Sequence, residues 1–143
     1  MADLDTARQC ADKMMAIDRS SRALGIAIDI PSVGEAIATM TVRDDMVNGF
    51  NVLHGGLTFA LADTAFAFAC NAYDEQSFAA AAQIEFLRPA KLGDVLTAAA
   101  SEDYRGRRSG YYSVAVRNQR DELVALFRGR CATKSDTGIL EKS

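Results

Sequence analysis

The 143-residue sequence contains little histidine and cysteine and has no excess of positive charge. It has one histidine and three widely separated cysteines, at Cys10, Cys70 and Cys131. A zinc site needs close His or Cys ligands, so we expect no metal. An odd number of scattered cysteines favours free thiols in a reducing cytoplasm over a disulfide framework. The net charge of -3 provides no basic surface for nucleic acid.

No segment predicts a membrane crossing or a phosphate loop. Residues 55–73 are nearly long enough to cross a bilayer, but Asp63 and many Ala, Thr and Gly residues interrupt their apolar character. The N-terminal residues carry mixed charge and predict a helix rather than a signal peptide. Glycine-rich loops of the Walker or dinucleotide-binding type are absent. The length and an apolar content of 49% predict one soluble globular domain over residues 1–143.

The most distinctive segment is residues 48–73, a loop rich in Gly and Asn followed by a long apolar run. Its length and its Ala, Leu and Phe content predict a helix over residues 55–73 that is buried on most sides. Asp63 is the one charged residue between His54 and Asp74. Burying an unpaired carboxylate is costly, so Asp63 is either a hydrogen-bonded or solvent-facing structural residue or a functional acid.

Two glycines, Gly55 and Gly56, stand where the first turn of this helix is expected. They either make the turn or let a ligand approach the backbone, whose first N–H groups can bind an oxygen that develops negative charge. Gly55 and Asp63 are eight residues apart, which is roughly 12 Å along a helix. Both cannot touch one reacting carbonyl, so a shared reaction would require two copies of the helix and therefore at least a dimer.

The remaining pattern predicts an α+β fold in which an antiparallel sheet curls round the central helix. An amphipathic N-terminal helix is expected within residues 1–24, ended by Gly25, and residues 133–143 are expected to be a frayed tail. The predicted strands are residues 26–30, 36–42, 77–87, 95–104, 111–118 and 123–132.

Basic residues gather at predicted strand ends and at one hairpin tip. They are either ordinary solvated charges or a set that holds the phosphates of a nucleotide-bearing ligand. The set consists of Arg88, Lys91, Arg105, Arg107 and Arg108.

Aromatic residues in and after the central helix have two interpretations. They are either core residues or the lining of an aromatic pocket. The residues concerned are Phe59, Phe66, Phe68, Tyr73 and Phe86.

Several motifs together resemble the hotdog-fold acyl-CoA thioesterases, and in particular the PaaI-type subfamily of phenylacetate degradation. They are an Asn-Gly loop, HGG at residues 54–56, and ADT at residues 62–64. The similarity continues through ADTAFAFACN, IEFLRPA and VALFRGR, so it covers residues 20–132. HGG alone would be a weak signal, but its spacing from the acidic helix residue makes the resemblance specific.

The resemblance implies hydrolysis of coenzyme A thioesters, with hydroxylated phenylacetyl-CoA as the acyl class. Coenzyme A would then be part of the substrate, and no separate cofactor would be needed. It also implies dimers whose two sheets join, commonly paired into a homotetramer, with the site at the dimer interface. Arg88, Lys91, Arg107 and Arg108 would be the candidate contacts to the CoA phosphates.

The same resemblance assigns roles to individual positions. Gly55 matches the residue whose backbone N–H polarises the thioester carbonyl, and Asp63 matches the catalytic carboxylate, contributed by the partner subunit. Asn48 matches a loop residue that positions water or substrate. His54 matches an orienting or structural group, and Thr64 could form a hydrogen bond near the site.

Some alternatives stay open at this level. Asp63 could activate water as a general base or attack the thioester directly. A non-catalytic acyl-CoA-binding protein would not need Asp63, and a hotdog hydratase or dehydratase would pair an acid with a histidine in another arrangement, whereas His54 is the only histidine here. The family often has His where Phe50 stands, so any role of that histidine is absent.

Overall fold

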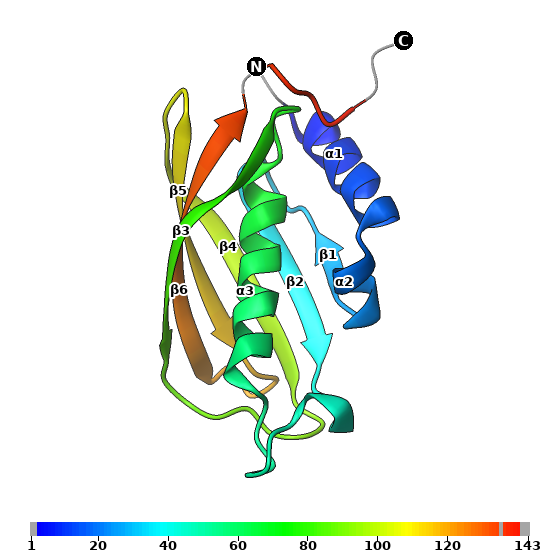
Figure 1. Ribbon diagram of the computed structural model, residues 1–143, viewed down its shortest axis with the longest axis vertical. Coiled ribbons are helices and arrows are strands. Elements are labelled where there is room, and N and C mark those ends of the chain that lie inside the picture. Colours follow the sequence, from blue (N-terminus) through cyan, green and yellow to red (C-terminus); the bar gives the residue numbers. More distant parts are fainter. Residues whose placement is uncertain (1–2, 135, 141–143) are drawn as a thin grey trace.

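The computed structural model describes residues 3–134 and 136–140 and contains one six-stranded antiparallel sheet that curls round a central helix, α3 (Figure 1). The strand order is β1-β2-β4-β5-β6-β3, so β1 and β3 are the two edges. This confirms the predicted α+β arrangement. In chain order the elements are α1 (Leu4–Ile17), α2 (Arg19–Ala23), β1 (Ala27–Asp29), β2 (Glu35–Thr41), the 3-10 helix η1 (Asp44–Met46), α3 (Gly55–Cys70), β3 (Gln76–Phe86), β4 (Val95–Arg105), β5 (Ser109–Arg117) and β6 (Leu123–Lys134).

The core is formed where α3 presses into the concave face of the sheet. Phe66 is fully buried, and its ring centroid lies 5.5 Å from that of Tyr112 and 5.8 Å from that of Phe127. Opposite Phe66 the sheet carries Gly129, where an added Cβ would lie only 2.8 Å from the phenyl ring. The glycine therefore makes room for the aromatic ring, and this contact fixes α3 along the sheet.

The edge strand β3 and one face of α3 lack the cover that the rest of the core has. β3 pairs only with β6, and its alanines over residues 79–82 are exposed on both faces. α3 runs beside β3 (Figure 1). It has a face of mostly small residues that is partly or fully exposed and recurs at helical spacing, comprising Gly56, Ala60, Asp63, Thr64 and Ala67. An open strand edge next to such a face is a surface on which another chain can pair.

The single N-terminal helix predicted within residues 1–24 is wrong, since the described residues form two helices that meet at Asp18. The Asp18 carboxylate accepts hydrogen bonds from the Ser21 backbone N–H at 2.9 Å and from the Ser21 hydroxyl at 2.7 Å. It therefore starts a new helix as an N-cap instead of continuing the first. Gly25, with φ of +71°, ends α2 as predicted.

The central helix is shorter at its C-terminal end than the predicted range of 55–73, because Asn71 caps it. The Asn71 amide nitrogen donates to the carbonyls of Ala67 and Ser77, each at 2.9 Å, and its oxygen accepts from the Ser77 N–H at 2.8 Å. These bonds lead the chain directly from α3 into β3.

Residues 133, 134 and 136–140 are more ordered than the frayed tail predicted for residues 133–143. β6 runs to Lys134, and beyond it the Asp74 carboxylate accepts hydrogen bonds from the N–H groups of Ile139 and Leu140 at 2.9 and 2.8 Å. Residues 135 and 141–143 lie outside the described part. None of the helices in the described ranges combines the length and the apolar character needed to cross a bilayer.

Candidate active site

The N-terminus of α3 presents one backbone N–H that forms no hydrogen bond within the described part of the chain. The Gly56 N–H donates to His54 Nδ1 at 2.8 Å, and the N–H groups of Leu57 and Thr58 donate to the His54 carbonyl at 2.9 and 3.3 Å. Over residues 3–134 and 136–140, the Gly55 N–H has no hydrogen-bond partner. Gly55 is thus the first-turn donor that is available to an oxygen with developing negative charge.

His54 is the N-cap residue of α3 and is itself anchored to the loop before it. Its backbone N–H donates to the Met46 carbonyl at 3.0 Å, and the preceding Leu53 N–H donates to the Ala90 carbonyl at 2.8 Å. Because Nδ1 accepts the Gly56 proton, the neutral ring carries its own proton on Nε2. This geometry supports the orienting role expected for His54.

We expect His54→Ala to lower the free energy of unfolding by about 1 kcal/mol, since it removes the cap of the central helix. His54→Asn should recover most of this loss, because an Asn side chain also accepts from the first turn. Denaturant unfolding of wild type, His54→Ala and His54→Asn measures the stability loss and its recovery. Steady-state thioesterase assays of the same three proteins show whether activity follows stability. Equal losses in the Ala and Asn variants would contradict the capping role.

Asn48 organises the loop that precedes this helix. Its side-chain oxygen accepts from the Phe50 N–H at 2.9 Å and the Val52 N–H at 3.4 Å, and Asn51 adopts a φ of +62° within the turn. Phe50 is exposed. The Asn48 amide nitrogen has no partner among the residues described, so it can donate to a ligand at this end of α3.

Asp63 lies two turns beyond Gly55 on the same continuous helix, roughly 12 Å along its axis. Its half-buried carboxylate has neither a hydrogen bond nor an ion pair within the described chain. Burial removes water from the ionised form and therefore raises the pKa of Asp63 above the usual value. The Thr64 hydroxyl does not reach it, because that group donates to the Ala60 carbonyl at 2.7 Å.

A pocket of about 300 Å³ opens directly beside Gly55. An added Cβ on Gly55 would lie 3.3 Å from the ring of Phe86, so the glycine keeps this approach open. Phe86 is 57% exposed and forms one wall. The pocket is lined by Leu53, Gly55, Thr58, Phe86, Leu87, Arg88, Pro89, Ala90 and Val124. Thr58 was not among the site residues expected from the sequence, although its spacing of three residues from Gly55 puts both on one helix face.

The aromatic residues divide between core and site. Phe66 and Phe68 are buried, so the core interpretation is confirmed for them. The Tyr73 hydroxyl donates to Glu102 at 2.7 Å, which is a structural bond. The pocket beside Gly55 therefore has one aromatic wall, Phe86, and not the five-residue aromatic lining considered from the sequence.

Within one chain the basic residues do not form a single cluster. Arg88 lines the pocket beside Gly55, and Lys91 follows nearby, where its backbone pairs with Val52. Arg107 and Arg108 lie at the tip of the β4–β5 hairpin, at the opposite end of the sheet (Figure 1).

Arg105 has a structural role. Its guanidinium lies 3.9 Å from the centroid of the Tyr73 ring and donates to the Cys70 carbonyl at 3.3 Å. A cation at this position also interacts favourably with the C-terminal end of α3. Arg105 is therefore not placed to hold a phosphate.

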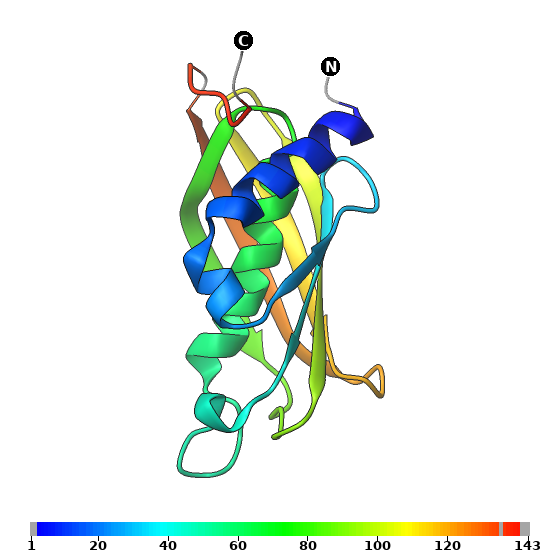
Figure 2. The same ribbon diagram turned by 90° about the vertical axis from the view of Figure 1, so that its right-hand side faces the viewer.

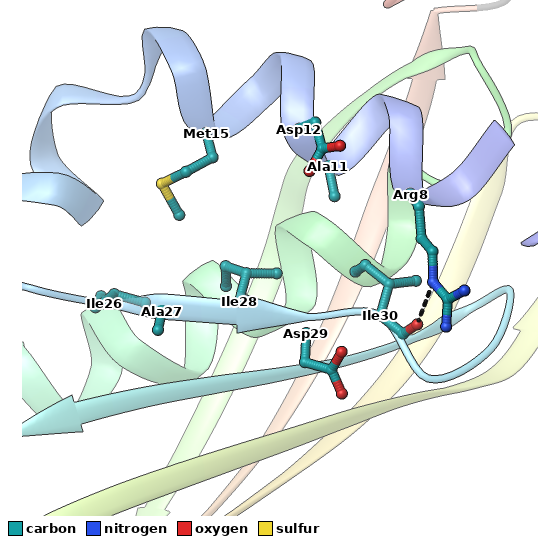
Figure 3. A pocket seen from close by; sticks show the side chains of 9 residues that line it. All are labelled: Arg8, Ala11, Asp12, Met15, Ile26, Ala27, Ile28, Asp29 and Ile30. Carbon is teal, nitrogen blue, oxygen red and sulfur yellow. Dashed lines mark hydrogen bonds between the residues drawn. The ribbon is translucent and has the colours of Figure 1, made fainter. Parts of the chain in front are cut away.

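α1 lies over the edge strand β1 (Figure 2), at the other edge of the sheet from β3. A second hollow of about 320 Å³ lies between α1 and β1 (Figure 3). In it the Arg8 side chain reaches from α1 and donates to the Ile30 carbonyl at 3.3 Å. Its other side chains include Asp12, Met15 and Asp29. This contact holds α1 over the edge strand β1 and is remote from α3's N-terminus.

Comparisons with known proteins agree with this geometry. The family model described as "Thioesterase superfamily" matches residues 50–125. The Acyl-coenzyme A thioesterase PaaI of Escherichia coli is 46% identical over 122 residues, which is 85% of this chain and 87% of that protein. The solved E. coli PaaI structure, from the phenylacetic acid degradation operon, superposes with a TM-score of 0.89 at 44% identity and covers 91% of this chain and 94% of its own.

A second solved structure extends the similarity. The TT0310 protein of Thermus thermophilus superposes with a TM-score of 0.77 at 36% identity, over 80% of this chain and 97% of its own. A putative esterase of Archaeoglobus fulgidus is 36% identical over 96 residues, which is 67% of this chain and 62% of that protein. The chain therefore belongs to the thioesterase superfamily, and it is a thioester hydrolase with the hotdog fold.

Proposed function

We propose that this protein hydrolyses arylacetyl-CoA thioesters, with ring-hydroxylated phenylacetyl-CoA as the preferred class, to the free acid and coenzyme A. The observation that carries the proposal is the unused Gly55 N–H at the start of α3, on a chain whose Asp63 carboxylate also lacks a partner within the described residues. The names of the E. coli relative and of its solved structure support an acyl-CoA substrate and a link to phenylacetic acid degradation, whereas the ring hydroxyl rests on the family resemblance. Free buried thiols at Cys10, Cys70 and Cys131 support a reducing, cytoplasmic setting.

The thioester carbonyl oxygen binds at the Gly55 N–H, where a preorganised donor and the positive end of α3 stabilise the charge that develops on it. One such donor contributes about 3 kcal/mol of transition-state stabilisation. The thiolate of coenzyme A leaves without strong acid assistance, because thiols have pKa values of about 8.5. A site with no general acid beside the leaving group is sufficient for this chemistry.

Asp63 acts as the general base that activates water. Burial raises the pKa of Asp63, which makes its carboxylate a stronger base than an exposed aspartate. Direct attack by the same carboxylate would instead form a mixed anhydride. Either role requires Asp63 close to the thioester, and the roughly 12 Å between it and Gly55 of the same helix is too long.

A two-fold dimer would bring Asp63 of one protomer close to Gly55 of the other. Antiparallel pairing of the open β3 edges would place the small-residue faces of two α3 helices against each other in opposite directions. Asp63 of one protomer then lies beside Gly55 of the other. The exposed alanines of β3 permit such close approach. Two dimers paired into a homotetramer remain a prediction from the family resemblance.

The same pairing would unite the two halves of the basic set. The tip of the β4–β5 hairpin lies beside the start of β3, since the Thr133 N–H donates to the Arg108 carbonyl at 2.9 Å and Thr133 pairs with Ser77. In an antiparallel dimer the end of the partner's β3, followed by its Arg88, approaches that point. Arg107 and Arg108 of one chain would thus face Arg88 and Lys91 of the other, where they could hold the phosphates of CoA.

Subunit complementation tests the proposed assembly. Asp63→Asn removes the carboxylate, and Gly55→Pro removes the backbone donor, so each variant alone should be nearly inactive. In a mixed dimer one of the two sites regains both intact groups, and random mixing should restore about a quarter of wild-type activity. Thiol release from hydroxyphenylacetyl-CoA by co-refolded variants measures the recovery.

Two controls make this result decisive. Unmixed variants taken through the same refolding should stay inactive, and sedimentation should show that mixed and unmixed samples have the same mass. No recovery from a verified mixed dimer would show that Gly55 and Asp63 do not serve one site across the interface.

A further inference from the structure

The Thr58 hydroxyl is the unexplained polar group of the site. Thr58 is only 3% exposed, and in the described ranges its hydroxyl has no hydrogen-bond partner. Thr64, six residues later, shows the usual alternative, in which the hydroxyl donates to the carbonyl four residues earlier. No described side-chain oxygen or nitrogen is both fully sealed and unpaired, so the Thr58 hydroxyl must reach open space.

That space is the pocket beside Gly55, which Thr58 lines. Apart from Arg88, its other side chains are apolar, and they are those of Leu53, Phe86, Leu87, Pro89, Ala90 and Val124. Arg88 stands at the rim, where its side chain is 51% exposed and forms an ion pair with Glu122 at 3.1 Å. The pocket therefore offers one side-chain hydroxyl among apolar side chains, close to the backbone of Gly55.

Such a pocket suits an apolar group that carries one hydrogen-bonding substituent. A cavity of about 150 Å³ can hold benzene. The pocket of about 300 Å³ has room for a substituted ring. Gly55 and Thr58 are three residues apart on one helix face, so a ring attached to a carbonyl at Gly55 would enter beside the Thr58 side chain.

We infer that Thr58 is a specificity-determining residue whose hydroxyl hydrogen-bonds a ring hydroxyl of the arylacetyl group. The inference rests on the proposed function and adds a selection step to it. An unsubstituted ring leaves the Thr58 hydroxyl unpaired in an apolar pocket, whereas a hydroxylated ring satisfies it. The pocket therefore favours the hydroxylated ring over the unsubstituted ring, because only the hydroxylated ring pairs with the buried Thr58 hydroxyl.

The test compares kcat/KM of wild type, Thr58→Val and Thr58→Ser on phenylacetyl-CoA and its 3- and 4-hydroxylated forms. Valine keeps the shape of threonine and removes the hydroxyl, while serine keeps the hydroxyl. For the favoured hydroxylated isomer, Thr58→Val should lose about fivefold to tenfold, and phenylacetyl-CoA should change less than about twofold. Thr58→Ser should retain the wild-type ratio between substrates.

Each other outcome overturns the inference. An unchanged substrate ratio in Thr58→Val shows that the hydroxyl does not contact the ring. An equal loss on all thioesters shows that the pocket holds a part common to every substrate, such as the pantetheine arm. If Thr58→Val does not fold, the test rests on Thr58→Ser, and an altered ratio between substrates in that variant overturns the inference. Wild type that cleaves no arylacetyl thioester overturns the proposed function as well, so the wild-type measurements separate the two failures.

Discussion

Asp63→Asn is expected to lower kcat by about 100-fold to 10,000-fold, with a much smaller change in KM. The amide has the shape of the carboxylate, but it can neither take a proton from water nor attack a thioester. Asp63 has no interaction partner among the described residues, so no group held against it could take over its role. Release of free thiol from phenylacetyl-CoA and its hydroxylated forms measures the loss.

The variant should nevertheless be at least as stable as wild type at neutral pH. Burial raises the pKa of Asp63 in the folded state, so folding favours the protonated form. The folded state is therefore favoured below the unfolded pKa and loses that advantage as the pH rises through the folded pKa. An uncharged Asn avoids this loss, and thermal unfolding at pH 7 should show an equal or higher Tm. A residue that limits stability in order to serve function follows the usual trade-off.

Asp29→Asn provides a matched control, because Asp29 is exposed on the edge strand β1 and undergoes the same change in charge. We expect it to keep wild-type kcat. Full activity of a folded Asp63→Asn enzyme would make Asp63 a structural residue. Tight binding of acyl-CoA without turnover by wild type would favour the binding-protein alternative over the hydrolase.

The fold was predictable because its strongest signals are local. The length and composition of residues 55–73 predict a buried helix, and alternating strands with short turns predict the antiparallel sheet. The break at Asp18 was missed because the amphipathic pattern continues across it. The break depends on the Asp18 side-chain cap, which contributes about 1 kcal/mol. Such a cap is formed by one polar side chain and leaves the spacing of the apolar residues unchanged.

The site was only partly predictable from the sequence. Gly55 and Asp63 have unusual residue types for their surroundings, and the family resemblance adds His54, so all three could be proposed as site residues from the sequence. Thr58 has no such signal, because a threonine in a helix commonly satisfies its own hydroxyl as Thr64 does. Whether a helical threonine such as Thr58 pairs its own hydroxyl in this way depends on the local packing. Likewise, the order and direction of the strands place Arg88 and Arg107 of one chain at opposite ends of the sheet.

Gly55→Pro should remove the proposed oxyanion donor while preserving the helix that carries it. Proline is favoured at the first position of a helix, and the Gly55 N–H has no partner in the described chain that folding would lose. The residue before a proline must be extended, and His54 already has φ of -59° and ψ of 131°. We expect kcat to fall by about 100-fold to 1,000-fold with little loss of stability.

Gly55→Ala separates the missing donor from simple crowding. Alanine keeps the N–H but adds a Cβ that would lie 3.3 Å from Phe86, a ring that is exposed and able to move. We therefore expect Gly55→Ala to retain kcat within a few-fold of wild type. Should alanine prove as damaging as proline, the contact with Phe86 would explain both losses, and Phe86→Leu in the alanine background should restore activity. Full activity of the proline variant would instead require the oxyanion to be stabilised by another donor, for which the Asn48 amide nitrogen, which has no partner among the described residues, is a candidate.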